Sequence, residues 1–201
     1  EQQVAPTFRD GDSDVEWTAA VVSIGESAAI RFTANVDQGH HIYVAAIDDA
    51  ESSTNFVITD KGDLRIGRPV TNAEVIEKVS HPKLPTLRYH IGEVTWFLPL
   101  EGNKSLPEGP RSIRGGIVYQ ACTDKMCPPP QALNFSADVE IGSDGSIELQ
   151  QPVPVQLTSA ERKEVLDQAA EAEWVDEIEF AVPDATEAVE DSSNTETENR
   201  D

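Results

Sequence analysis

The sequence predicts an all-β protein, built as an antiparallel β-sandwich and followed by a short helix and a disordered acidic tail. Two observations predict the sandwich: many short segments alternate apolar with polar residues, and turn-forming residues lie between these segments. A third observation, the low apolar content after Pro183, predicts the tail. A jelly roll or a barrel would produce the same alternation, so the pattern alone leaves these architectures open.

The strands expected from the alternation are short and follow one another closely. Turn signals such as Asp37-Gln38-Gly39 and Glu101-Gly102-Asn103 separate them. Because little helix is expected among them, the pattern favours a sandwich of antiparallel sheets. The predicted strands are residues 15–22, 28–36, 41–47, 55–58, 74–79, 94–100, 112–121 and 133–141.

The composition changes along the chain and divides it into five predicted parts. The first residues are polar and the middle carries the strand pattern, while Pro152 and Pro154 indicate an extended linker or an edge strand over residues 150–157. The parts are a flexible lead-in (1–13), the sandwich domain (14–145), an extended linker (146–157), a helix (158–175) and a disordered acidic tail (176–201).

The helix prediction rests on Thr158 and Glu161, which have the spacing of a capping box. A weak apolar stripe follows, so we expect the helix to lie against the sandwich or to fray within a linker, in preference to binding a partner. The stripe consists of Val165, Leu166, Ala169, Ala170 and Trp174.

The charge of the chain excludes two classes of function. A net charge of −22 repels nucleic acids and anionic membrane surfaces, and 15 acidic residues against 3 basic ones lie in residues 158–201. No apolar run is long enough to span a bilayer. The chain starts at Glu1 and Met126 is its single methionine, so we expect a processed or truncated product.

Both cysteines lie in one stretch, residues 117–130, where the predicted strand 112–121 ends at Cys122. A tight reversal can bring Cys122 and Cys127 to the Cα separation of roughly 5.5 Å that a disulfide prefers. Such a bridge closes a small loop and contributes only about 2 kcal/mol through chain entropy. Three prolines after Cys127 make the return path stiff. The spacing leaves three alternatives open: a static clip, a redox-active pair and a metal site.

The residues around the cysteines resemble a known family. Tyr119-Gln120-Ala121-Cys122 followed by Cys127-Pro128-Pro129 is similar to the signature of the N-terminal periplasmic domain of the thiol:disulfide interchange protein DsbD, also called the disulfide bond corrector domain. The resemblance covers about residues 14 to 142. Its upstream pieces agree in order: Val15-Glu16-Trp17-Thr18, Gly39-His40-His41-Ile42-Tyr43, and Tyr89 followed by a strand that ends Leu98-Pro99-Leu100.

This resemblance implies a fold and a function. The fold is an immunoglobulin-like sandwich, and the activity is thiol–disulfide exchange without a cofactor. The setting is the periplasm or an equivalent extracytoplasmic space, reached by a signal-bearing precursor. Electrons would pass from a membrane electron-transfer domain, which could belong to the same full-length chain, or from a thioredoxin-like protein to oxidised thioredoxin-fold partners, in processes that include cytochrome c biogenesis.

The resemblance also implies roles for single residues. The second cysteine of the family forms the mixed disulfide, which makes Cys127 the attacking thiol and Cys122 the resolving thiol. Local charge leaves the identity of the thiolate open, because Lys125 should lower the pKa of a neighbouring thiol and Asp124 should raise it. The candidate site-lining residues are His41, Tyr43, Tyr119, Lys125, His81 and Leu84.

Two departures from the family pattern concern the surroundings of the cysteines. The family closes a cap loop with aromatic residues over its disulfide, and the matching stretch here, 77–85, has no Phe or Tyr. His81 and Leu84 are its candidate cap residues. The cysteines enclose four residues here, one fewer than in the best-known member, which leaves the geometry of the turn open.

Two other function classes remain as alternatives. The four histidines, both cysteines and Met126 are residue types that bind copper or zinc, but no histidine follows the first cysteine within the turn, and the prediction names no metal ligand. The histidines are His40, His41, His81 and His90. The other alternative is a non-catalytic immunoglobulin-like interaction module, in which the bridge is structural and hard to reduce.

Overall fold

The computed structural model describes residues 5–46, 52–168 and 178–184. Strands dominate these residues, and one short helix, α1, lies near the end of the second range. The elements are β1 (Val15–Ile24), β2 (Ser27–Val36), β3 (His41–Tyr43), β4 (Ala45–Ala46), β5 (Thr54–Asp60), β6 (Arg65–Ile66), β7 (Ile76–Lys78), β8 (Leu87–His90), β9 (Glu93–Glu101), β10 (Gly109–Tyr119), β11 (Ala121–Cys122), β12 (Gln131–Ile141), β13 (Ile147–Glu148), β14 (Val153–Pro154), β15 (Gln156–Ala160) and α1 (Arg162–Gln168).

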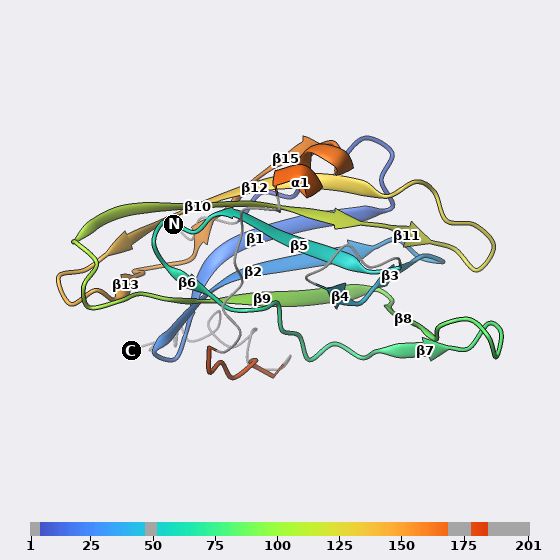
Figure 1. Cartoon of the computed structure of the whole chain (residues 1–201), viewed down its shortest axis with the longest axis horizontal. Coiled ribbons are helices and arrows are strands. Elements are labelled where there is room, and N and C mark those ends of the chain that lie inside the picture. The colour runs from blue at the N-terminus through green and yellow to red at the C-terminus, as the bar shows by residue number, and fades with distance from the viewer. Residues whose placement is uncertain (1–4, 47–51, 169–177, 185–201) are drawn as a thin grey trace, which may run out of the picture.

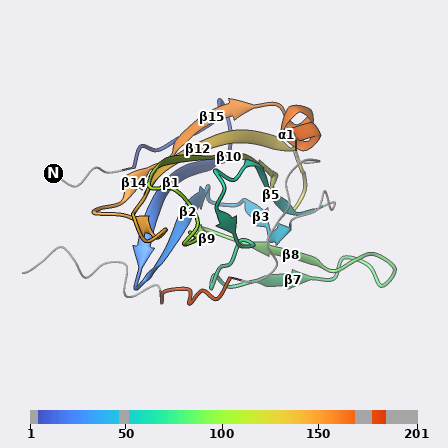
Figure 2. The same ribbon diagram turned by 60° about the vertical axis from the view of Figure 1, so that its left-hand side comes forward.

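Two large sheets form the body of the molecule. One has the strand order β14-β1-β2-β9-β6, and the other has the order β13-β12-β10-β5-β4 with β15 beside β12. All pairings in these sheets are antiparallel except β4 with β5. Figures 1 and 2 show the sheets as two layers. The predicted all-β sandwich with a short helix is therefore confirmed.

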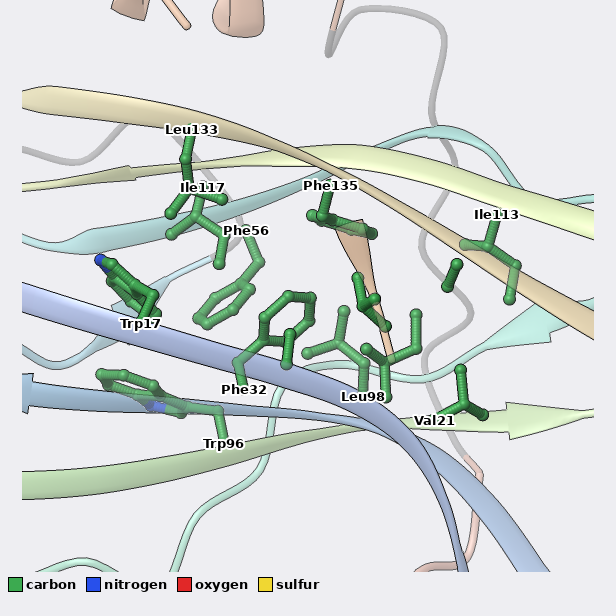
Figure 3. Close-up of a cluster of buried hydrophobic side chains, with 14 of the residues drawn as sticks. Trp17, Val21, Phe32, Phe56, Trp96, Leu98, Ile113, Ile117, Leu133 and Phe135 are labelled. Carbon is green, nitrogen blue, oxygen red and sulfur yellow. The ribbon is translucent and has the colours of Figure 1, made fainter. Parts of the chain in front are cut away.

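Period-two alternation builds the core between the layers. Along β1, Val15, Trp17, Ala19 and Val21 all face inward and belong to the main hydrophobic cluster. Figure 3 shows aromatic and aliphatic side chains of both sheets meeting there, with Phe32 among them. Its ring centroid lies 4.9 Å from that of Phe135, which comes from the opposite sheet. The alternation predicted from sequence thus corresponds to one buried and one outward face.

The core anchors the end of the strand that leads to the cysteines. The ring of Tyr119, the last residue of β10, packs edge-on against Trp17 at a centroid distance of 5.1 Å. Its hydroxyl lies 3.1 Å from Ser13 Oγ. Burial raises the pKa of Tyr119, and the hydrogen bond to Ser13 opposes that shift. Because the residue three positions before Cys122 is held in the core, β11 starts from a fixed point.

A third, smaller sheet lies at one end of the sandwich and has the order β11-β3-β8-β7. Figure 1 shows it at the end where the loop from β11 to β12 (yellow) turns back and where the β7–β8 hairpin projects. Ile42 opposes both Ala121 on β11 and His90 on β8, so β3 is the central strand that joins them. The predicted strand 41–47 is split here into β3 and β4, and Ile47 lies outside the described residues.

The N-terminal segment differs from the predicted flexible lead-in. Phe8 and Trp17 exchange two backbone hydrogen bonds, each 2.8 Å long. Arg9 forms a bidentate pair with Asp37, at 2.8 and 3.0 Å, and Ser13 is buried. These long-range contacts hold residues 8–13 against the sandwich. The composition of residues 1–13 does not reveal these contacts, because the partner residues lie later in the chain.

The structure forms strands in the predicted linker, including the edge strand β14, and corrects the predicted helix start. Residues 146–157 contribute strands β13 and β14 and the first residues of β15 to the two sheets. Thr158 lies within β15, opposite Asn134 of β12, and is not a helix cap. Pairing with β15 satisfies backbone groups along β12, which a local capping pattern does not take into account. Helix α1 starts at Arg162 instead.

Helix α1 lies against the outer face of the second large sheet, as expected for a helix that packs on the sandwich. Val165 is 1 % exposed and forms a small cluster with Val57, Val118 and Ala132. The remainder of the predicted helix, after Gln168, lies outside the described residues. This helix, the one that the described ranges contain, does not have the length and apolar character needed to cross a membrane.

Part of the predicted acidic tail is described and packs on the sandwich. The Phe180 ring lies 5.7 Å from the ring of Phe97 on β9, centroid to centroid. Asn72 donates a hydrogen bond of 2.8 Å from its side-chain amide to the carbonyl oxygen of Pro183. Residues 178–184 thus cover apolar side chains on the outer face of the first large sheet. Residues 176, 177 and 185–201 of the predicted tail lie outside the described residues.

Candidate functional site

Cys122 and Cys127 are joined by a disulfide at the end of the sandwich that carries the small sheet. Their sulfur atoms are 2.08 Å apart, and their Cα atoms are 4.4 Å apart. Cys122 ends β11, and the loop that contains Cys127 leads into β12. The tight reversal expected from the cysteine spacing is therefore present.

The two sulfurs differ in their access to solvent. Cys122 is 0 % exposed, whereas Cys127 lies on the surface. Thiol–disulfide exchange requires the attacking thiolate to reach a sulfur atom, so access decides which sulfur reacts with another protein. Cys127 is the sulfur that an external thiol or disulfide can reach.

Hydrogen bonds within the loop hold the turn between the cysteines. The Thr123 amide donates to the carbonyl oxygen of Met126 at 2.9 Å. The Thr123 hydroxyl oxygen accepts from the amides of Met126 at 3.0 Å and Lys125 at 3.2 Å. Gln120 donates from its side-chain amide to the carbonyl oxygen of Pro128 at 2.5 Å. Together with the prolines, these bonds keep the turn in one conformation.

Tyr43 brings a hydroxyl group to the exposed sulfur. Its oxygen lies 3.6 Å from Cys127 Sγ, and because a disulfide sulfur carries no proton, the hydroxyl is the donor. Tyr43 is 3 % exposed and belongs to β3, so its side chain has little freedom to move away. A donor at this position stabilises negative charge on the Cys127 sulfur when the disulfide is opened.

His41 occupies the strand position beside the buried cysteine. His41 is the direct cross-strand partner of Cys122 in the pairing of β3 with β11. Its ring centroid is 4.2 Å from that of Tyr89 and 5.6 Å from that of Tyr43. Burial lowers the pKa of His41 below its ordinary value of 6.5. The imidazole is therefore neutral at pH 7 and can accept a proton.

An ion pair connects the cysteine turn to the β7–β8 hairpin. Lys78 Nζ on β7 lies 3.2 Å from Asp124 Oδ1 in the turn. Both side chains are substantially exposed to water, so the pair contributes at most about 1 kcal/mol. It nevertheless places the hairpin beside the turn, at the same end of the molecule (Figure 1).

Apolar side chains on the surface gather around this end. The large hydrophobic residues with exposed side chains in the described ranges are Val79, Leu84, Ile91 and Met126. Met126 lies between the cysteines, Val79 follows the residue that pairs with Asp124, and Ile91 lines a pocket of about 540 Å³ together with His41, Tyr89 and Asp124. These residues come from the cysteine turn, the β7–β8 hairpin and the position after β8.

The structure brings together four of the predicted site residues. The disulfide is formed by Cys122 and Cys127. The hydroxyl of Tyr43 contacts Cys127, and His41 is the cross-strand partner of Cys122. Lys125 lies exposed within the turn, where its amide contributes to the turn and its side chain faces solvent.

The other predicted site residues lie elsewhere. Tyr119 is 0 % exposed and packs against Trp17 in the core. It therefore anchors the end of β10 that leads to Cys122 and does not line the site. His81 and Leu84 lie in the turn of the β7–β8 hairpin, where the Leu84 amide donates to the carbonyl oxygen of His81 at 3.0 Å. Among the described residues, neither shows a contact with the cysteines, and both are exposed.

Sequence reasoning missed four residues that shape the site: Lys78, Tyr89, Gln120 and Thr123. Thr123 carries a local signal, because a threonine whose hydroxyl accepts from the next amides is common in turns. Gln120 stands within the recognised motif but gives no sign of its partner. Tyr89 reaches the site by pairing with Tyr43 on the distant strand β3, and Lys78 reaches it through the ion pair with Asp124. No local pattern reveals either contact.

The residue types that suggested a metal site are dispersed. Both cysteines are bonded to each other, and the described ranges contain no group of three or more His, Cys, Asp or Glu side chains placed to hold a metal. His40 Nε2 lies 3.5 Å from Asp14 Oδ2, and His90 Nδ1 lies 2.7 Å from the carbonyl oxygen of Glu74. In this oxidised state no thiolate is available as a ligand.

Comparisons with known proteins place one solved structure beside this chain. No family model and no curated protein gives a significant match. The crystal structure of the Neisseria meningitidis DsbD N-terminal domain in the reduced form matches with 19 % identity and a TM-score of 0.36, over 64 % of this chain and 86 % of that chain. A match at this level carries no residue roles with it. The chain is similar to the DsbD N-terminal domain, the family that its cysteine motif resembles.

Proposed function

We propose that this chain is a thiol–disulfide interchange domain whose reactive pair is Cys122 and Cys127. The observation that supports it is the unequal exposure of the two sulfurs: Cys127 is open to solvent and Cys122 is fully buried. A structural clip has no need of an exposed sulfur beside a buried hydroxyl donor, whereas an exchange catalyst needs one sulfur to meet the partner and another to resolve the complex.

The reaction proceeds in two displacements. In the reduced protein, the Cys127 thiolate attacks one sulfur of a partner's disulfide, the partner's S–S bond breaks, and its second sulfur leaves as a thiolate that takes up a proton. The Cys122 thiolate then attacks Cys127 Sγ and releases the partner's remaining sulfur. The domain's dithiol is oxidised by two electrons to the disulfide, and the partner's disulfide is reduced to a dithiol.

The hydroxyl of Tyr43 contributes to the first displacement. At 3.6 Å from Cys127 Sγ, it can donate to the sulfur when that sulfur is a thiolate. A hydrogen bond to an ionised group is stronger than one to a neutral group, so it favours the thiolate, which is the reactive form.

The proposed cellular role is an electron relay in the periplasm. A membrane electron-transfer domain, in the same full-length chain or a separate protein, would reduce Cys122–Cys127, and the domain would pass the electrons to oxidised thioredoxin-fold partners, including those of cytochrome c biogenesis. The resemblance of the cysteine motif supports this role. The exposed side chain of Met126, next to Cys127 in the turn, gives a partner an apolar group to contact.

The first experiment is the reduction potential of the pair, measured by equilibrating the protein in glutathione or dithiothreitol buffers and counting free thiols by mass spectrometry. A value between about −120 and −270 mV is that of known exchange catalysts and supports the proposal. A value below about −300 mV identifies a structural bridge and overturns it in favour of a non-catalytic interaction module.

A second experiment tests which cysteine carries the mixed disulfide. A Cys122→Ala variant keeps the exposed thiol and lacks the resolving one, so it should accumulate a mixed disulfide with an oxidised thioredoxin-fold protein. The matched Cys127→Ala variant keeps only the buried thiol and should accumulate little. Equal trapping by both variants would contradict the assignment of Cys127 as the contact sulfur.

A further inference from the structure

The neighbour of the buried sulfur is a titratable ring. In the antiparallel pairing of β3 with β11, His41 stands directly opposite Cys122. Side chains of directly opposed residues lie on the same face of a sheet, with Cβ atoms typically about 4.5 to 5.5 Å apart. The His41 and Cys122 side chains thus leave neighbouring positions on one face, while the Tyr43 hydroxyl lies at the other sulfur, that of Cys127.

The second displacement requires that the Cys122 thiol lose its proton, and His41 is placed to accept it. A thiol must lose its proton before it attacks, and a thiol in buried, apolar surroundings holds its proton more tightly than one in water. Cys122 is fully buried, so bulk water and buffer have poor access to its proton. A proton acceptor within the protein is needed for fast resolution.

The environment of His41 keeps its ring neutral and in place. Stacking on Tyr89 and the edge contact with Tyr43 restrict rotation of the ring. Burial is the largest influence on the pKa of His41 and lowers it; the Asp124 carboxylate opposes this effect, and the positive charges of Lys78 and His40 add to it. Lys78 and Asp124 also pair with each other at 3.2 Å, so their effects on the ring partly cancel.

We propose that His41 is the general base of the resolving step and takes the proton from the Cys122 thiol as its sulfur attacks Cys127. This inference rests on the proposed exchange function and assigns a step within it. The S–H bond of Cys122 breaks, a new S–S bond forms between Cys122 and Cys127, and the bond from Cys127 to the partner's sulfur breaks. The imidazolium then returns its proton to the departing thiolate or to water. In the reverse direction it protonates the Cys122 thiolate.

Other titratable groups near the site are less suited to this role. His90 Nδ1 donates to the carbonyl oxygen of Glu74, and its ring packs edge-on against Trp96, on the core side of β8. Asp124 is exposed and paired with Lys78. The Tyr43 hydroxyl is directed to Cys127 and donates there.

The test separates the two displacements in time. Fully reduced protein is mixed in a stopped-flow instrument with excess 4,4′-dithiodipyridine, a small neutral disulfide that releases a coloured thiopyridone at each step. The first release reports attack by Cys127, and the second reports resolution by Cys122. A Cys122→Ala variant, which has no second step, identifies the first phase.

In a His41→Gln variant we expect the second phase at pH 7 to slow by about 10²-fold, the lower end of what a positioned proton acceptor contributes, with the first phase retained. A His41→Phe variant keeps a ring against Tyr89 and should show the same loss, which separates proton transfer from packing. The pH profile provides the second readout. In the unsubstituted protein the second phase should fall only below the lowered pKa of His41; in both variants it should rise steadily with pH through the neutral range, as the thiol itself ionises.

The matched control is His40→Gln. His40 is the adjacent histidine and its ring faces Asp14. Its charge is the smallest of the influences named for the pKa of His41, so its replacement should leave the first phase unchanged and the second phase nearly unchanged. The inference is overturned if the second phase and its pH profile are unaffected in both His41 variants, or if both phases slow equally, which indicates a packing role. Absence of a fast first phase in the unsubstituted protein would overturn the exchange function itself, and this inference with it.

Discussion

The hydroxyl oxygen of Tyr43 lies 3.6 Å from Cys127 Sγ, and Tyr43 shares a strand with His41, the cross-strand partner of Cys122. Two residues of one short strand, β3, are thus each associated with a different cysteine of the disulfide. The period of two in a strand places both side chains on one face. This arrangement assigns a different chemical task to each ring, and each task can be tested by a separate substitution.

Replacing Tyr43 with Phe should make the reduction potential more negative. The hydroxyl stabilises the Cys127 thiolate, and therefore the reduced form, by a charged hydrogen bond of about 1.5 kcal/mol. Loss of that bond corresponds to a shift on the order of 30 mV for a two-electron couple. The control is Tyr89→Phe, which removes a hydroxyl from the same aromatic cluster and should leave the potential nearly unchanged. Equal shifts in both variants would point to a general change of the cluster.

Lowering the pH should destabilise the fold before the carboxylates titrate. Burial lowers the pKa values of His41 and His90, so below the unfolded value of about 6.5 the unfolded chain binds more protons than the folded one. Stability is therefore fully present above this value and falls as the pH drops toward the folded values. Urea unfolding at pH 7.5 and pH 5.5 measures the difference.

The surroundings of His90 explain why its protonation destabilises the fold. Its Nδ1 donates to the carbonyl oxygen of Glu74, and its Nε2 is buried without a partner among the described residues, so protonation would bury an unpaired N–H group. A His41→Gln, His90→Gln double variant should be less stable at pH 7.5 and less sensitive to the change in pH. An unchanged sensitivity would mean that other groups dominate the acid response.

Replacing Thr123 with Val should loosen the turn between the cysteines. The substitution keeps the shape of the side chain but removes an oxygen that accepts from the amides of Lys125 and Met126. We expect a loss of about 1 kcal/mol in the free energy of unfolding of the oxidised protein. The same substitution at Thr59, which has no such acceptor role in the described contacts, is the control. A loss no larger than that of the control would show that the Thr123 hydroxyl is not needed to hold the turn.

Replacing Phe180 with Ala should weaken the attachment of residues 178–184. The ring contact with Phe97 and the apolar area that it covers predict a loss of about 1 kcal/mol in unfolding free energy. The exchange kinetics should remain those of the unsubstituted protein, because the site described above lies at the cysteine turn. Hydrogen exchange of the backbone amides in β9 would report local opening, and unchanged exchange there would contradict the predicted contact.

The negative charge should select partners electrostatically. With a net charge of −22, the protein should react faster with a basic thioredoxin-fold disulfide than with an acidic one at low salt, and added salt should reduce the difference. Exchange rates measured between 20 and 500 mM salt test this directly. Rates that do not change with ionic strength would exclude charge as a determinant of partner choice.

The amino-acid sequence by itself determined most of the long strands and showed that a bridge between the cysteines is sterically easy. The alternation along residues 112–121 is a local property, and it identified the strand that leads to Cys122 before any contact was known. The short spacing and the prolines likewise indicated a tight turn. The prediction of the helix start was wrong because it used only a local signal. The capping pattern at Thr158 is local, whereas Thr158 pairs with the distant Asn134 in the sheet.

Tertiary structure alone decided which sulfur is exposed, which ring faces each sulfur and which predicted residues belong to the site. Tyr119 is part of the same motif as Cys122, yet its ring lies in the core against Trp17. His41 lies 81 positions before Cys122 in the sequence and becomes its neighbour through one strand pair. Register between distant strands sets these relationships, because a shift of one residue would turn every side chain of β3 to the opposite face.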